Sequence, residues 1–379
     1  MKLRQLSLIF ALWLMSFFSL AGEPIVIGET LIIDSKVLMK QVSINIRLPT
    51  SYQASKQKRY PVYFNLGADD SFAATAGILQ SLSHNQEYPM PETIFVSLST
   101  ETAVSIINRG VKSEDFINFL ETDVIPYIDK HYRTQPFRIL ASGERFGMAP
   151  LYGLIHNPKL FQAYILISPW ITDKSGLLSD FETFLKSSKE TSAFLWLSSG
   201  DEPKVVPNYN KLILLLQQHA PEKLDWKNAQ HNQYISSVQS MISLPNALVS
   251  LFADRVLAPD SPVISAGVES IKSYYQQLSD NKYGYAISSE NAIRALGMAM
   301  FNKGRVKKAI EIFQINIKDY PNSPHVYATM ASALTEKGDL TGALAMQKIA
   351  SELATKQNDA WESYYKKVLI DIENKLSTN

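Results

Sequence analysis

The sequence contains no cysteine among its 379 residues. This absence excludes disulfide bonds, thiolate nucleophiles and thiolate metal ligands, and it leaves no thiol to accept a lipid anchor. None of the six histidines pairs with another at a metal-binding spacing such as H-E-x-x-H. The sequence therefore predicts neither a metal site nor a cofactor.

An excess of charge of one sign is also lacking. Lysine and arginine total 37, aspartate and glutamate total 36, and the formal net charge is +1. A protein that binds nucleic acid through its phosphates needs a concentration of positive charge. The charge balance gives no indication of a nucleic-acid partner.

A hydrophobic run opens the chain, from Leu6 to Leu20, directly after Lys2 and Arg4. It is shorter than the ~20 apolar residues that a membrane helix needs, and small residues suited to cleavage follow it. We therefore expect residues 1–21 to be a secretory signal peptide, and the mature protein to be exported without a stable membrane span.

Residues 22–256 alternate short β-type runs with helical ones. Several of the β-type runs are apolar throughout, as expected for strands buried on both faces. Between them, residues 113–132 carry a single apolar stripe with acidic residues in the first turn, which predicts a helix. This alternation predicts an α/β domain with a mostly parallel sheet and helices on both faces. The strand candidates are YPVYFNLG, ETIFVSLS, FRILAS, FQAYILIS, SAFLWLSSG and a longer run, KVLMKQVSINIRLP.

The β pattern ends at a proline-containing segment, residues 257–267, which we predict to be a linker. Residues 268–379 then follow a helical pattern with an internal repeat. Gly338 lies 34 residues after Gly304, and Trp361 lies 34 residues after Tyr327. This is the tetratricopeptide period, and two units with a closing helix are predicted. The matching positions are Ile293, Leu296, Gly297, Met300, Gly304, Ala309, Phe313 and Pro321, then Tyr327, Met330, Ala331, Leu334, Gly338, Ala343 and Ala350.

The segment LASGERFGM has the layout of a nucleophile elbow, G-x-S-x-G, between a β-type run and a helical one. Gly143 and Gly147 occupy the two glycine positions, and the position of the serine is taken by Arg145, with Phe146 beside it. Ser142 is a neighbouring hydroxyl, but we expect it to lie in the strand and to point away from the turn.

Around this elbow the chain resembles the Putative esterase family, α/β-hydrolases similar to esterase D and the enterochelin esterases. The resemblance rests on YPVYFNLGA, FINFLETDVIPYIDKHYRT, RILASGERFGM and LFQAYILISPWITD. It extends to the helical region, since some bacterial members carry a similar tetratricopeptide-like extension. The resemblance implies an α/β-hydrolase fold, a serine esterase ancestry and a location in the periplasm.

The resemblance also implies where the other site residues lie. Asp201 or Glu202, after a predicted strand, takes the place of the catalytic acid, and His231 takes the place of the histidine. The family's L-D-G oxyanion segment appears here as Leu66, Gly67 and Ala68. Of the family's Arg-Asp-x-Thr-Pro element, only Arg109 is left as a remnant.

Arginine cannot replace serine, because its guanidinium stays protonated and only donates hydrogen bonds. Two roles are open for Arg145. It binds a carboxylate or phosphate ligand at the pocket floor, together with Phe146, Gly67 and Ala68, or it forms a structural ion pair with Asp201 or Glu202.

We expect an exported esterase-family protein with a degenerate serine-hydrolase site, acting in ligand binding or protein interaction. The ligand is expected to be a small molecule, with an anion as the option that Arg145 favours, and a protein partner is expected to use the helical region. One alternative is an active carboxylic-ester hydrolase with an unorthodox site. Another is a scaffold that acts only through its helical repeats.

Overall fold

The computed structural model describes residues 25–66, 71–84, 90–108, 113–172, 175–234, 236–357 and 359–378. The predicted signal peptide, Gly67, Ala68 and Arg109 lie outside the described residues. The backbone of Arg145 is described, and its side chain is not. Within the described part of the chain, no helix is both long and apolar enough to cross a membrane.

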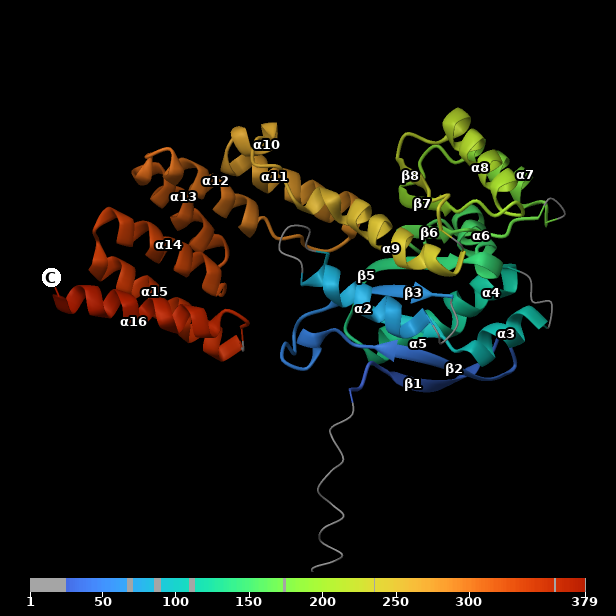
Figure 1. Cartoon of the computed structure of the whole chain (residues 1–379), viewed down its shortest axis with the longest axis horizontal. Coiled ribbons are helices and arrows are strands. Elements are labelled where there is room, and N and C mark those ends of the chain that lie inside the picture. Colours follow the sequence, from blue (N-terminus) through green and yellow to red (C-terminus); the bar gives the residue numbers. More distant parts are fainter. Residues whose placement is uncertain are drawn as a thin grey trace, which may run out of the picture.

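An eight-stranded sheet forms the centre of the first part of the chain (Figure 1). Its order is β1-β2-β4-β3-β5-β6-β7-β8. The pairs β1–β2 and β2–β4 are antiparallel and all the others are parallel. The strands are β1 Glu29–Ser35, β2 Lys40–Arg47, β3 Tyr60–Asn65, β4 Ile94–Leu98, β5 Thr134–Gly143, β6 Ala163–Ile167, β7 Ala193–Ser199 and β8 Leu224–Gln230.

Helices cover both faces of this sheet, because successive residues of the central strands are apolar and point to opposite sides. In β7, Leu195 and Leu197 join the core on one face, while Phe194 and Trp196 join the core on the other. The first face is covered by α4 Ser113–Phe119, α5 Ile125–His131, α6 Met148–His156, α7 Leu177–Ser187 and α8 Val206–His219. The predicted helix at 113–132 is present as α4 and α5, joined through a π-helical turn, Leu120–Val124.

The second face carries the junction with the helical region. It is covered by α2 Phe72–Ser83, α9 Ser236–Phe252 and α11 Val268–Leu278. Ile271 and Tyr275 of α11 belong to the same hydrophobic cluster as Phe137 and Ile139 of β5. The segment predicted as a linker contains a short helix, α10 Pro262–Ser265, whose Ile264 is buried in this cluster too. The sheet and the start of the helical region therefore share one core.

Polar contacts reinforce the junction. The carboxylate of Asp254 accepts hydrogen bonds from Lys282 Nζ at 2.5 Å and from Tyr283 Oη at 2.7 Å. The hydroxyls of Tyr274 and Tyr275 donate to the carbonyl oxygens of Asp254 and Arg255, each at 2.8 Å. Burial raises the pKa of Tyr275 to about 12, so this hydroxyl keeps its proton and remains a donor at neutral pH.

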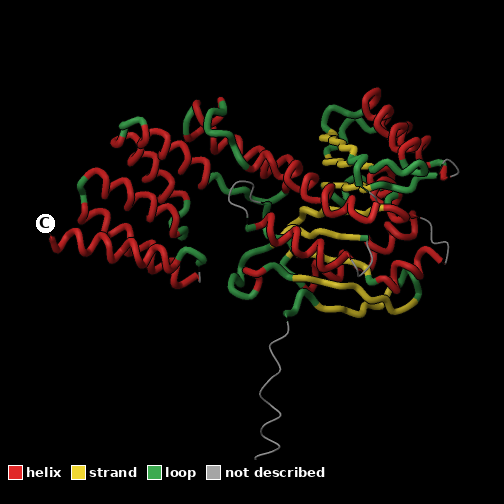
Figure 2. Tube along the Cα trace, viewed as in Figure 1, coloured by secondary structure: helices red, strands yellow, loops and turns green. Residues whose placement is uncertain are grey.

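The remaining helices run side by side in hairpins (Figures 1 and 2). Gly304 and Gly338 have φ of 72° and 86° and stand in the turns after the first helix of each hairpin. Gly297 admits the ring of Phe313, since a Cβ there would lie 2.3 Å from that ring. These helices are α12 Glu290–Asn302, α13 Val306–Asp319, α14 Pro324–Lys337, α15 Leu340–Gln357 and α16 Glu362–Thr378.

Glu92, just ahead of β4, fixes the loop between β2 and β3. Its carboxylate accepts from Lys58 Nζ at 2.6 Å, from Ser51 N at 3.0 Å, from Thr50 Oγ1 at 3.1 Å and from the hydroxyl of Ser51. Burial alone would raise the pKa of Glu92, but the hydrogen bonds from Lys58 and Ser51 outweigh it and lower the pKa to about 2.

The shared core predicts how truncated chains behave. A chain ending at Arg255 loses the cover of Phe137 and Ile139, and we expect it to aggregate. A chain ending at Asn322 keeps α11 to α13. We expect this chain to unfold in one cooperative thermal transition and to elute as a monomer. Size-exclusion chromatography and circular dichroism measure both. Equal folding of the two truncated chains would show that the core is not shared.

Glu92 makes stability depend on pH. Because its pKa is lower in the folded chain than the ~4.3 of an unfolded glutamate, it stabilises the fold above about pH 4.3, and this is lost as pH falls toward 2. We expect Glu92→Gln to lower the free energy of unfolding by about 1–2 kcal/mol at neutral pH, with a gap that shrinks on acidification. Urea titration at several pH values measures this. Glu190→Gln, at an exposed ion pair with Lys223, serves as the control and should change little.

Candidate functional site

The carboxyl end of β5 turns directly into a helix. The strand ends at Gly143, a 3-10 turn spans Glu144–Phe146, and α6 begins at Met148. This is the strand-turn-helix context that a nucleophile elbow requires.

The turn differs by one residue from the sequence prediction. The glycine spacing puts Arg145 at the middle of the turn, but the residue with left-handed backbone, φ 48°, is Glu144. The reason lies in the sheet, since β5 pairs with β6 as far as Gly143 and Ile167, and the change of direction falls on the next residue. Glu144 is half-buried and its carbonyl oxygen accepts from Gly147 N at 3.1 Å and from Trp170 N at 2.9 Å.

The two glycines of the motif are needed for close packing. A Cβ on Gly147 would lie 2.5 Å from Cα and Cβ of Pro169, and a Cβ on Gly143 would lie 2.9 Å from the carbonyl oxygen of Ile167. The φ angles of Gly143 and Gly147, −133° and −60°, are ordinary, so the requirement is for space.

The side chains flanking the turn are used inside the fold. Ser142 is 2% exposed, and its hydroxyl donates to the carbonyl oxygen of Phe146 at 2.8 Å. The ring of Phe146, which we expected to contribute to ligand binding, packs against the hydrophobic core under the sheet. Ser168, directly after β6, also has left-handed backbone, with φ 45°, and its buried hydroxyl has no hydrogen-bond partner in the residues that the structure describes.

The acid position after β7 has two carboxylates in different surroundings. Asp201 is exposed, whereas both carboxylate oxygens of Glu202 are buried and have no hydrogen-bond partner among the described residues. Glu202 and Gln239 both lie against Gly200, since a Cβ there would lie 2.7 Å from Glu202 Oε2 and 2.8 Å from Gln239 Nε2. Glu202 is thus the inward-facing member of the pair.

His231 follows β8 directly, and its backbone N donates to the carbonyl oxygen of Ser199 at 2.9 Å. Its ring Nε2 is buried and has no hydrogen-bond partner within the described part of the chain. Gln239, which sequence analysis did not single out, donates to the carbonyl oxygens of His231 at 3.1 Å and Tyr234 at 3.0 Å. The sheet therefore brings Glu144, Glu202 and His231 to one edge, at the carboxyl ends of β5, β7 and β8. Among the described ion pairs, none joins Glu202 to His231.

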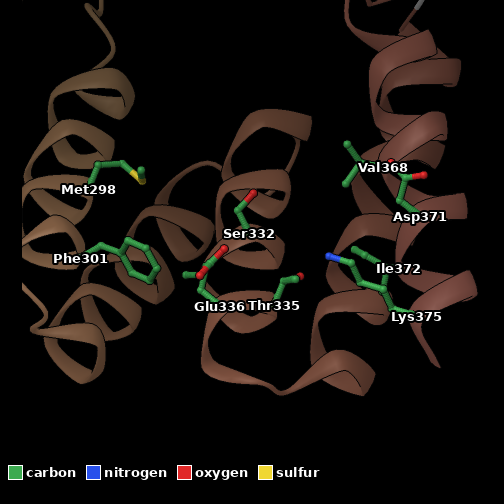
Figure 3. A pocket seen from close by; sticks show the side chains of 10 residues that line it. Met298, Phe301, Ser332, Thr335, Glu336, Val368, Asp371, Ile372 and Lys375 are labelled. Carbon is green, nitrogen blue, oxygen red and sulfur yellow. The ribbon is translucent and has the colours of Figure 1, made fainter. Parts of the chain in front are cut away.

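A separate cavity of about 240 Å³ lies in the helical region, between α12, α14 and α16 (Figure 3). Apolar and charged side chains share its wall. The labelled residues are Met298, Phe301, Ser332, Thr335, Glu336, Val368, Asp371, Ile372 and Lys375. In the part of the chain that the structure describes, no three His, Asp or Glu side chains are grouped so that they could hold a metal ion.

Comparison with known proteins places this geometry in a family. Residues 35–242 match the Esterase family model, described as Putative esterase. No curated protein sequence matches the chain.

Solved structures show the same fold. The chain is similar to an IroE-like serine hydrolase from Shewanella oneidensis, with 18% identity, a TM-score of 0.60, and 76% of this chain and 98% of that one covered. An uncharacterised protein from Capnocytophaga ochracea is similar over 92% of this chain and 99% of its own, with 15% identity and a TM-score of 0.61. The predicted α/β-hydrolase fold followed by an all-helical region is confirmed.

The packing of Gly147 gives a test of the turn. We expect Gly147→Ala to lower the free energy of unfolding by about 1–3 kcal/mol, because Pro169 is held by the backbone and cannot make room. Gly77→Ala, in an exposed part of α2 with nothing within 4 Å, should instead raise stability by about 0.5–1 kcal/mol. Chemical denaturation of the two variants measures the contrast, and a neutral Gly147→Ala would contradict this packing.

Proposed function

Because the chain belongs to the Esterase family, we propose that it is a family member that has lost serine-based ester hydrolysis and acts in binding. Its ligand is a small molecule held at the former esterase site, and a protein partner is held by the helical region. The proposal includes export, which rests on the sequence of residues 1–21.

One observation carries the proposal. The left-handed residue of the elbow, where a serine hydrolase holds its nucleophile, is Glu144, and the next residue is Arg145. Neither side chain has a hydroxyl, and the adjacent serine, Ser142, is buried with its hydroxyl bonded to a backbone carbonyl. Removing a triad nucleophile typically lowers turnover by a factor of about 10^6.

The remaining groups suit binding. Arg145 supplies a fixed positive charge beside the turn, and such a charge favours a ligand with a carboxylate or a phosphate. Glu144 supplies a negative charge one residue away, so the site offers both a positive and a negative charge to a polar ligand. The other role considered for Arg145 is a structural ion pair with Glu202 or Asp201, and these two carboxylates have different surroundings. Glu202 is buried and has no hydrogen-bond partner among the described side chains, whereas Asp201 is exposed to solvent.

A second candidate is ester hydrolysis through an unorthodox site. It is supported by His231, whose Nε2 is buried and unpartnered, and by the buried carboxylate of Glu202 at the same edge of the sheet. A histidine imidazole is able to act as a general base on water, without a protein nucleophile.

The helical region is a candidate for partner binding. Its resemblance to tetratricopeptide repeats comes from the 34-residue spacing of Gly304 and Gly338. The cavity between α12, α14 and α16 combines Met298 and Phe301 with Glu336 and Lys375, a mixture that is able to hold a partner side chain by apolar and ionic contacts.

Fluorophosphonate labelling followed by intact mass tests the proposal. We expect no adduct on the purified chain, beside full labelling of an active serine hydrolase of the family. A stoichiometric adduct on the unmodified chain would overturn the proposal and identify an activated serine.

Two variants refine this test. Glu144→Ser restores a hydroxyl at the left-handed residue, and Arg145→Ser places one a single residue later. We expect any regained labelling and ester turnover to appear with Glu144→Ser and not with Arg145→Ser. The reverse result would show that Arg145 holds the nucleophile position.

A further inference from the structure

A groove of about 1030 Å³ lies between the sheet domain and the helical region. One wall is formed by the loop between β2 and β3, the residues just ahead of β4, and the first residues of β5. The other wall is formed by residues near Tyr285, by His325 of α14, by Gln357 at the end of α15, and by residues 359–361 ahead of α16.

The groove is distinct from the former esterase site. It opens at the amino ends of β3, β4 and β5, through Arg59, Glu92 and Gln135. The elbow lies at the carboxyl end of β5, after Gly143, which is roughly 25 Å from Gln135 along an extended strand. A ligand in the groove does not reach the elbow unless it is longer than this.

The two parts of the chain that form the walls share one core. The hydrophobic cluster that includes Phe137, Ile271 and Tyr283 runs from the sheet into the helical region, and Asp254 is tied to Lys282 and Tyr283. In Figure 1, α9 and α11 follow one another along this junction and connect the two parts. A groove between parts that share a core is a preformed binding surface.

Charge is distributed unevenly along the groove. The acidic groups are already engaged: Glu92 is paired with Lys58, and Asp359 accepts from the backbone N of Trp361 at 2.7 Å and lies 3.8 Å from His325 Nε2.

Two arginines, in contrast, contact only neutral acceptors. Arg59 Nη1 donates to the carbonyl oxygen of Thr134, and Arg255 Nη1 donates to Tyr285 Oη, each at 3.3 Å. Within the described residues neither has a carboxylate within ion-pair distance. Each guanidinium has five N–H donors, so most of this capacity and both positive charges are left for a ligand.

The groove also offers an aromatic surface. Trp361 is 43% exposed and lines the groove opposite the β2–β3 loop, together with the partly buried Tyr285. Exposed tryptophan beside arginine is the composition of binding hot spots. Serine, threonine and glutamine side chains complete the lining and are able to bond to peptide amides.

We propose that this groove binds an extended peptide segment that carries acidic side chains. Arg59 and Arg255, one from each wall, bind its carboxylates, and Trp361 packs against an apolar or aromatic side chain between them. The volume is at the upper limit of the ~300–1,000 Å³ typical of small-molecule sites, and it suits a chain that runs through an open groove. This proposal is independent of the chemistry at the elbow.

Fluorescence anisotropy with a fluorescein-labelled peptide of alternating glutamate and tyrosine tests the proposal, using the full mature chain. We expect saturable binding that weakens as salt is added, and no binding of the matching lysine-tyrosine peptide. Arg59→Gln and Arg255→Gln should each weaken binding about tenfold, the equivalent of one charge-assisted hydrogen bond of about 1.4 kcal/mol. Trp361→Ala should weaken it by a similar factor.

Controls separate this site from others. Arg305→Gln, at an exposed arginine outside the groove, should leave binding unchanged, as should Glu144→Ala at the elbow. Arg255 also lies 5.8 Å from the ring of Tyr283, so the Arg59→Gln result carries the test if Arg255→Gln lowers the thermal midpoint.

Three results would overturn the proposal. They are equal binding of both peptides, binding that survives Arg59→Gln together with Arg255→Gln, and displacement of the peptide by a sulfated oligosaccharide that binds more tightly. The last would identify the groove as a carbohydrate site.

Discussion

The central strands carry apolar side chains on both faces, and no single layer of helices can remove both faces from water. In β5, Leu140 faces one layer, while Ile139 and Ala141 face the other. The second layer is completed only when α9 is joined by α11 and the start of α12. The position of the helical region, the groove beside it and the rigidity of the junction all depend on this requirement.

Much of the fold was predictable because buried strands have a simple signature. The runs that became β3 to β7 are short and apolar, and they stand between helical patterns. The strands β1 and β8 were not predicted, because they lie at the sheet edges. In β8, the polar residues Asp225, Lys227 and Asn228 stand at exposed positions, so the sequence resembles a loop. An edge strand is recognised by its hydrogen bonds to the neighbouring strand. The pattern of apolar and polar residues within the strand does not reveal those hydrogen bonds.

The sequence predicted which segments form the site, but it did not predict which side chain in each segment faces inward. Glycine spacing located the elbow, but the pairing of Gly143 with Ile167 decides that Glu144 is the left-handed residue. The choice between Asp201 and Glu202 depends on burial, which neighbouring residues in a sequence do not reveal. Gln239 had no signal at all, since its contact with the His231 loop arises from how α9 packs after β8. Spacing thus indicates which segments meet, and packing decides which side chain faces inward.

The hydrogen bonds of Asp254 limit how the two parts of the chain can be exchanged during evolution. Asp254 lies shortly after the part that matches the Esterase family, residues 35–242, while Lys282 and Tyr283 belong to the segment that leads into the helices. A recombination event that exchanged the helical region alone would leave a half-buried carboxylate without its two donors. Substitutions on one side of the boundary should therefore correlate with substitutions on the other.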